Sequence, residues 1–164
     1  MTIGLIGPSH CFDDRCCDIT IAVIRTKHVD HGYVSELYFY ATDGDEFVGD
    51  AAGRIGEVEA TRAWLERNNK GGWAGEQWDQ FDPGEVVGYF MGLSVDPAHR
   101  GSGHGRRLAK RLVAEMKKRG ADAIWLSVAP MDRDTDCEGL VRLYKSLGFV
   151  AVDGEDCPTM VLRP

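Results

Sequence analysis

The stretch whose residue types best allow chemistry is the segment 95–106, Val-Asp-Pro-Ala-His-Arg-Gly-Ser-Gly-His-Gly-Arg. Its alternating glycines let the main chain adopt positive φ and approach a ligand with no Cβ in the way. The N–H groups of such a loop, and of a helix that begins behind it, converge on a point that favours negative charge. Arg100 and Arg106 flank that point with guanidinium groups, which suit phosphate. The segment therefore predicts a pyrophosphate-binding loop.

Three closely spaced glycines do not by themselves indicate a ligand, because the pattern alone is weak. The plainest alternative is a tight turn between a strand and a helix, with nothing bound. A Walker loop is excluded, since no Gly-Lys-Ser/Thr sequence follows the glycines. A dinucleotide-binding (Rossmann) fingerprint fits poorly, because the spacing is G-x-G-x-G and the loop lies late in the chain.

The elements that must position this loop are a strand before it and a helix after it. The apolar run 86–95 predicts the strand, and Pro97 ends it because proline fixes φ and donates no hydrogen bond. Apolar residues at helical spacing predict a helix over 105–119. The next apolar run, 123–128, is typical of a strand buried on both faces. This order predicts a right-handed parallel crossover.

A second informative stretch is 143–149, Leu-Tyr-Lys-Ser-Leu-Gly-Phe, at the end of a predicted helix. Thr135 and Glu138 form a capping box that predicts its start, and Gly148 is expected to end it. A phenol such as that of Tyr144 has a pKa near 10, so it is protonated at neutral pH and can donate to a leaving thiolate. The alternative is an ordinary core tyrosine.

Together the two stretches resemble the GNAT superfamily of N-acetyltransferases. The acetyl-CoA loop of that family has the pattern Arg/Gln-x-x-Gly-x-Gly/Ala, which Arg100, Gly103 and Gly105 match. The stretch 143–149 is similar to the late helix of the family, in which a tyrosine faces the CoA sulfur. The resemblance covers about residues 86–162.

The resemblance implies an α/β (α+β) fold. This fold has a mixed, mostly antiparallel central sheet with helices on both faces and a splayed parallel strand pair. One domain is expected over residues 1–164, with a cofactor half at about 85–164 and an acceptor-side half at about 1–84.

The resemblance also implies an activity, transfer of an acetyl group from acetyl-CoA, as cosubstrate, to a primary amine of a small molecule or protein. The amine would attack directly in a ternary complex, with Tyr144 as general acid. The cofactor-binding residues implied are Leu93, Ser94, Val95, Arg100, Gly101, Ser102, Gly103, His104, Gly105, Arg106, Ser127, Cys137 and Tyr144. An alternative is a non-catalytic CoA-binding or interaction domain with the same fold.

The general base is the weakest part of the resemblance. Many relatives carry a glutamate in the middle of the cofactor strand, whereas residues 86–91 of this chain include no carboxylate. Glu85 is the first candidate and Asp82 or Asp79 the next, and an amine that binds already neutral needs no base. Cys137 stands where the family often has an asparagine, and His104, expected to face the core, stands where an aliphatic residue is common.

The first half of the chain departs further from the family, which usually has two helices between its first two strands. Residues 18–26 are rich in β-branched side chains, and residues 33–42 include three consecutive aromatic residues. With the turn residues Asp43-Gly44-Asp45 and a third, glycine-containing stretch at 46–55, they predict an antiparallel meander. A helix is expected over 56–69. The loop 73–83 carries Trp73, Trp78 and Phe81, which predict either a lid over the acceptor or rings packed on the core.

Composition limits the class of protein. The 164 residues have 43% hydrophobic and 27% charged side chains, which is ordinary for a soluble domain. A net charge of −7 disfavours nucleic acid and acidic membranes and suits a cationic amine. Acyl transfer to a nucleobase is a weaker alternative. No run predicts a membrane span or a signal peptide, so a cytoplasmic location is expected. A monomer or homodimer is expected.

The five cysteines are expected to be free thiols, since their number is odd and no secretion signal precedes them. A zinc site is conceivable from residues gathered near the N-terminus, namely His10, Cys11, Cys16, Cys17, His28 and His31. Because the cysteine spacing is not C-x-x-C and no second pair follows, no metal is expected.

Overall fold

The computed structural model describes residues 18–29, 32–68, 78–130, 132 and 135–164. They form a seven-stranded sheet with the order β1-β2-β3-β4-β5-β7-β6. The strands are β1 (Asp18–Val29), β2 (Gly32–Asp43), β3 (Glu46–Glu57), β4 (Val86–Val95), β5 (Ala123–Ser127), β6 (Val150–Ala151) and β7 (Thr159–Leu162). The helices are α1 (Val58–Asn68), α2 (His104–Lys118), α3 (Cys137–Lys145) and the 3-10 helix η1 (Pro97–His99). Neighbouring strands are antiparallel except β4 and β5, which are parallel, so the predicted fold class is confirmed.

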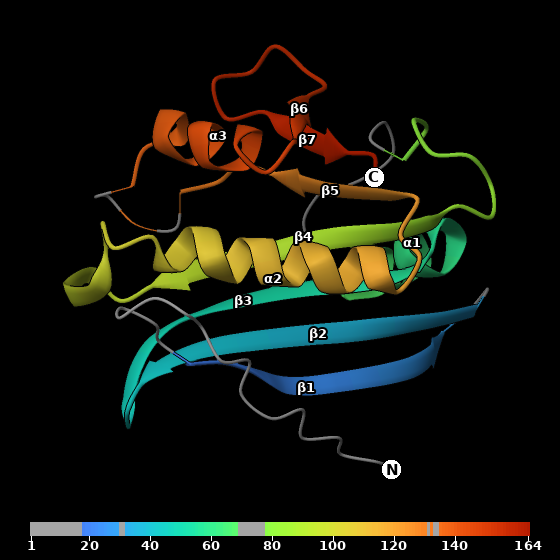
Figure 1. Cartoon of the computed structure of the whole chain (residues 1–164). Helices are drawn as coiled ribbons and strands as arrows, with labels where there is room; N and C mark the ends of the chain where they lie inside the picture. The colour runs from blue at the N-terminus through green and yellow to red at the C-terminus, as the bar shows by residue number, and fades with distance from the viewer. Residues whose placement is uncertain (1–17, 30–31, 69–77, 131, 133–134) are drawn as a thin grey trace.

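Two hydrophobic cores lie on opposite faces of this sheet. Helices α2 and α3 cover one face, where the apolar stripe of α2, including Leu112 and Met116, packs against Leu37 and Phe39 of β2. Helix α1 packs on the other face in a second core that includes Trp125 of β5. Figure 1 shows α2 crossing the near face and α1 lying behind the sheet. The sheet thus has a distinct α2 face and α1 face.

The predicted meander is confirmed. As also predicted, a second strand, β2, rather than two helices follows the first strand, β1. Three long strands follow one another, and α1 comes between β3 and β4. Side chains alternate between the two faces along β2, and Leu37, Phe39 and Ala41 are buried on the α2 face. Tyr38 and Tyr40, between them, are only half-buried on the α1 face.

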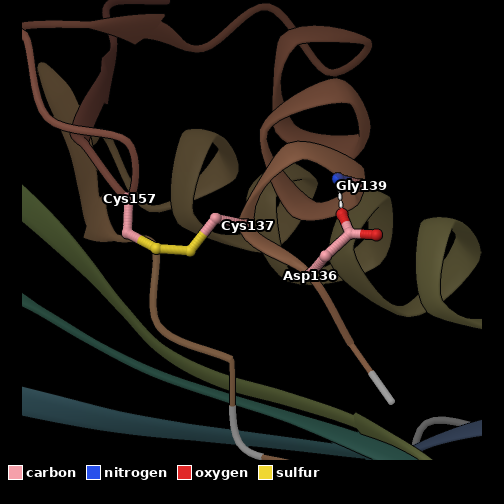
Figure 2. Close-up of a disulfide and its surroundings, with 4 residues drawn as sticks. All are labelled: Asp136, Cys137, Gly139 and Cys157. Atoms are coloured by element: carbon pink, nitrogen blue, oxygen red, sulfur yellow. Dashed lines mark hydrogen bonds between the residues drawn. A yellow bond between two sulfur atoms is a disulfide. The ribbon is translucent and has the colours of Figure 1, made fainter. Parts of the chain in front are cut away.

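The start of α3 differs from the prediction in two ways. Its N-cap is Asp136 rather than Thr135, because the Asp136 carboxylate accepts a hydrogen bond from the Gly139 N–H (Figure 2). Cys137 is bonded to Cys157, with a Cα–Cα distance of 5.3 Å, so the expectation of free thiols is wrong for this pair (Figure 2). The segment between β6 and β7, which contains Cys157, returns beside the N-terminus of α3. The number of cysteines in a sequence does not reveal such a tertiary contact.

The segment before β4 packs on the sheet. Trp78 and Phe81 are buried, and Trp78 lies edge-on to Trp125 with ring centroids 5.2 Å apart. For these two rings the packing alternative holds rather than the lid. Trp73, the proposed zinc residues before Asp18 and His31 lie outside the described residues. The described part of the chain contains no group of three or more metal-binding side chains and no helix long and apolar enough to cross a membrane.

Candidate active site

The candidate site begins where β4 and β5 separate. The parallel pairing ends at Tyr89 and Trp125, although β4 continues to Val95. On its other side β4 pairs with β3, and the register shifts so that Met91 is an extra residue between the partners of Ala52 and Gly53. Such a bulge bends a strand and increases its twist. Among the described residues, the edge of β4 that faces β5 therefore has no strand partner beyond Tyr89.

A cavity of about 350 Å³ occupies this divergence. It is lined by the separated parts of β4 and β5, one face of α3 and two loops, through Tyr89, Phe90, Met91, Gly92, Leu93, Ser94, Val95, Arg100, Gly105, Leu126, Ser127, Ala129, Asp132, Thr135, Leu140, Leu143 and Tyr144. The size suits a small molecule or an extended chain.

The glycine loop closes one end of the cavity. Gly101 and Gly103 have φ values of 79° and 80°, which disfavour any residue with a Cβ. Space is not the reason for these glycines, because a Cβ at either would meet no heavy atom within 4 Å. Gly103 is the N-cap of helix α2 and provides no side-chain cap. An uncapped helix N-terminus beside an open loop is a favourable position for an anion.

Arg100 joins the two walls of the cavity. Its Nε donates to the Val95 carbonyl at 3.0 Å, and its Nη2 lies 2.6 Å from Oδ2 of Asp132, which follows β5. Arg106 is exposed on the first turn of α2. His104 is half-buried beside Arg107, with 2.8 Å between Nδ1 and Nη2. Burial, followed by the Arg107 charge, lowers the pKa of His104.

Tyr144 lines the same cavity from α3. Its ring lies edge-on to Phe90 at 5.6 Å and to Phe149 at 5.9 Å, and only 7% of the residue is exposed. Burial raises the pKa of its phenol to about 12, because the charged form would lose its hydration. Across the cavity, the Ser127 hydroxyl is buried and has no hydrogen-bond partner among the described residues. Buried hydroxyl groups usually have one, so this group is suited to a ligand.

The cavity brings together seven of the predicted cofactor residues, Leu93, Ser94, Val95, Arg100, Gly105, Ser127 and Tyr144. Five more lie in the adjoining loop and the first turn of α2, namely Gly101, Ser102, Gly103, His104 and Arg106. Cys137 is not among the lining residues, and its sulfur is bonded to Cys157. Its side chain therefore has no thiol to offer pantetheine.

Glu85 is also apart from the cavity. Its carboxylate accepts hydrogen bonds from Arg163 at 2.6 Å and from the Asp82 N–H at 2.8 Å. The Arg163 hydrogen bond chiefly lowers the pKa of Glu85, which weakens it as a base. The first lining residue, Tyr89, is roughly 13 Å farther along an extended strand. The structure therefore does not bring Glu85 to the other predicted site residues.

The sequence missed Gly92, Asp132, Leu140 and Leu143, which also line the cavity. Leu140 and Leu143 recur at helical spacing, a pattern that does not separate a core face from a cavity wall. Asp132 stands in a polar segment with no motif. The bulge at Met91, which depends on pairing with β3, has no local pattern.

Residues 14–149 match the sequence profile of the acetyltransferase (GNAT) family. The chain belongs to this family. A 57-residue segment is 37% identical to the [ribosomal protein bS18]-alanine N-acetyltransferase of Escherichia coli K12, and it spans 35% of this chain and 35% of that relative. The Drosophila melanogaster polyamine N-acetyltransferase has a similar fold, with a TM-score of 0.55 at 17% identity, covering 77% of this chain and 74% of that one. The NatC complex bound to Gag peptide and CoA aligns with a TM-score of 0.51 at 14% identity, over 77% and 70% of the two chains.

Proposed function

We propose that this chain transfers the acetyl group of acetyl-CoA to a primary amine by direct attack in a ternary complex. The observation that carries the proposal is that one cavity is lined both by Arg100, beside the glycine loop, and by Tyr144. A thioester anchored by its diphosphate at the loop can extend along the unpaired edge of β4, with its sulfur directed toward the phenol. Family membership supports the same chemistry.

The anchor is the loop of residues 100–106 and the N-terminus of α2. When the ligand binds, Arg100 leaves its ion pair with Asp132 and pairs with the diphosphate instead. This exchange is feasible because the side chains of the pair are 34% and 39% exposed, and exposed ion pairs contribute only about 0–1 kcal/mol. A diphosphate offers more negative charge, together with hydrogen bonds from the loop amides.

Tyr144 serves as the general acid. With a pKa of about 12, its phenol is protonated at neutral pH and donates a hydrogen bond to the sulfur as the C–S bond breaks. Because a thiol has a pKa near 8.5, full transfer to a free thiolate is unfavourable unless the phenol is reprotonated. The departing amine proton supplies that proton. The Ser127 hydroxyl is the side chain suited to bind pantetheine or the acyl oxygen.

An alternative, a non-catalytic CoA-binding domain, is favoured by one observation. The only carboxylate among the described lining residues is Asp132, and it is bonded to Arg100. This alternative predicts acetyl-CoA binding with no release of thiol when amines are added. Transfer above the uncatalysed rate excludes it.

Titration calorimetry with acetyl-CoA tests the anchor. Arg100→Glu should weaken binding about 100-fold, because it removes a charge-assisted hydrogen bond and adds a repulsive charge. Lys118→Glu is the matched control, since it makes the same charge change on the last residue of α2, far from the loop. Absent binding by the wild type, or equal binding by wild type and Arg100→Glu, would reject the proposed function.

A further inference from the structure

A row of polar side chains lies on the α1 face of strands β2, β3 and β4, beside the cavity. In the registers of β2, β3 and β4, Tyr40 is opposite Asp50 and Asp50 is opposite Ser94. Directly opposed residues have Cβ atoms about 4.5–5.5 Å apart. Ser94 lines the cavity, so Asp50 stands at its margin, one strand away.

The neighbours of these residues establish which face they occupy. Ala51 packs in the α2 core, and a Cβ on Gly49 would meet Leu108 of α2 at 3.3 Å. A Cβ on Gly105 of α2 would meet Leu93 and Val95 on either side of Ser94. Because side chains alternate along a strand, Asp50 and Ser94 point to the opposite face.

The adjacent row contains two small residues. Tyr38 is opposite Ala52, and Ala52 is opposite Gly92. Gly92 lines the cavity, and a Cβ placed on it would meet no heavy atom within 4 Å. On the far side of this row, Arg54 lies against Met91. The open space over Gly92, which we call the hollow, is part of the cavity, and Gly92 lies in the row between those of Asp50 and Arg54.

Two carboxylates, Glu36 and Asp50, flank this hollow, and they differ in whether a cation is paired with them. Glu36 is buried and already compensated, since it lies 3.3 Å from Arg54 and 3.1 Å from Lys27. Asp50 is half-buried and makes no hydrogen bond or ion pair with the described part of the chain. Burial alone raises the pKa of Asp50. A partly desolvated carboxylate without a partner is stabilised by an incoming cation.

We propose that Asp50 binds the acceptor amine as its ammonium ion in the hollow over Ala52 and Gly92 and then accepts a proton from it. This assignment rests on the proposed function. The acceptor enters from the α1 face, whereas Tyr144 packs on the α2 face, so nucleophile and proton donor approach the thioester from opposite sides of the divergence.

Asp50 takes one proton from the ammonium ion, which leaves a neutral amine with a lone pair. The nitrogen attacks the thioester carbonyl carbon, the C–N bond forms and the C–S bond breaks. A second N–H proton reaches the sulfur through Tyr144, and Asp50 releases its proton to solvent. The products are the amide and the free thiol.

The same arrangement restricts the class of acceptor. Arg54 lies on the far side of the hollow, and its guanidinium is held by Glu36 and stacked on Trp64 at 3.3 Å. An acceptor with a carboxylate next to its amine would bring that carboxylate close to Asp50, and Arg54 is already paired with Glu36. We therefore expect primary amines on apolar or cationic carriers, and weak activity with amino acids that keep a free α-carboxylate.

The test measures acetyl transfer by thiol release with three probes, butylamine, 1,4-diaminobutane and an alanine-initiated tripeptide amide. Asp50→Asn should lower kcat/KM about 100-fold with each probe that the wild type acetylates. Asp50→Glu, which keeps the charge, should recover part of the loss. Asp45→Asn, in the exposed β2–β3 turn, is the matched control and should behave as the wild type. Glycine should be a poorer acceptor than butylamine.

The outcomes separate this assignment from the function on which it rests. If wild type and Asp50→Asn bind acetyl-CoA equally and Asp50→Asn acetylates amines at a rate within about twofold of wild type, the role of Asp50 is rejected. The proposed acetyltransferase activity is then retained. Wild type that binds acetyl-CoA but acetylates none of the three probes also overturns the assignment. Loss of acetyl-CoA binding by the wild type rejects the proposed function itself. Circular dichroism must show that Asp50→Asn is folded, and Asp50→Glu provides an independent test if it is not.

Discussion

The two sides of the cavity are built in different ways. On the cofactor side, a single continuous segment supplies the loop, its positive-φ glycines and the uncapped N-terminus of α2. On the acceptor side, Tyr40, Asp50 and Ser94 come from three strands and meet only through strand register. The cofactor side thus presents mainly main-chain groups, whereas the acceptor side presents side chains. The first is fixed by local geometry and the second by packing of the whole sheet.

This difference predicts that the two sides respond differently to substitution. On the cofactor side, replacing a group that contacts the thioester should change turnover and leave stability nearly intact. On the acceptor side, the buried ion pair beside the hollow should matter for stability and leave acetyl-CoA affinity unchanged. Three substitutions test these expectations, in order of decreasing effect.

Tyr144→Phe should have the largest effect, lowering kcat about 1,000-fold, or about 4 kcal/mol, because the proton donor is lost while the ring still fills its site. The acetyl-CoA dissociation constant should change little. Steady-state kinetics and calorimetry measure the two quantities.

A control comes from alkaline unfolding. The pKa of Tyr144 is about 12 when folded and near 10 when unfolded, so the neutral phenol stabilises the fold fully below pH 10. That contribution is lost as pH rises from about 10 to 12, and Tyr144→Phe should lack this part of the loss. A variant with wild-type kcat would contradict the acid role.

Arg54→Met should lower the free energy of unfolding by about 3 kcal/mol, because it leaves the buried Glu36 with only the half-exposed Lys27 as partner. Urea denaturation followed by fluorescence measures the change. The double variant Arg54→Met with Glu36→Met should recover most of it, since replacing both charges leaves neither buried and unpaired. A loss below about 1 kcal/mol in the single variant would contradict this account.

Cys157→Ser should have the smallest effect, about 2 kcal/mol of stability, because the bond closes a loop across a sequence separation of 20 residues. Since Cys137 does not line the cavity, acetyl-CoA affinity should stay within about twofold of wild type. A reductant should lower the stability of the wild type and not that of the variant. Equal responses of the two proteins would contradict the prediction.

The disulfide also bears on location. Such bonds persist mainly in oxidising compartments, whereas thiols are kept reduced in the cytosol. The expected cytoplasmic location stays a prediction, and Cys137–Cys157 is the observation that weighs against it. Counting free thiols in protein isolated under conditions that block exchange would decide whether the bond forms in the cell.

Much of the fold was predictable because its signals are local. Residue types and turn residues predicted the three strands of the meander within a few residues, and β4 ends at Val95 as expected from Pro97. The N-cap of α3 was assigned to Thr135 instead of Asp136, because either side chain can cap a helix and the choice depends on the exact backbone path. Candidate site residues were predictable where they belong to one segment, as in the loop that contains Arg100.

The sequence by itself determined the glycine loop, the elements around it and the tyrosine on the last helix, because φ/ψ preferences and helical spacing act over a few residues. Only the tertiary structure decided that Cys157 meets Cys137, that Glu85 is bound by Arg163, and that Asp50 stands beside Ser94. These contacts depend on strand register, on the bulge at Met91 and on the return of the chain after β6. A one-residue change of register would turn Asp50 to the other face of the sheet, and no local pattern in the sequence fixes that choice.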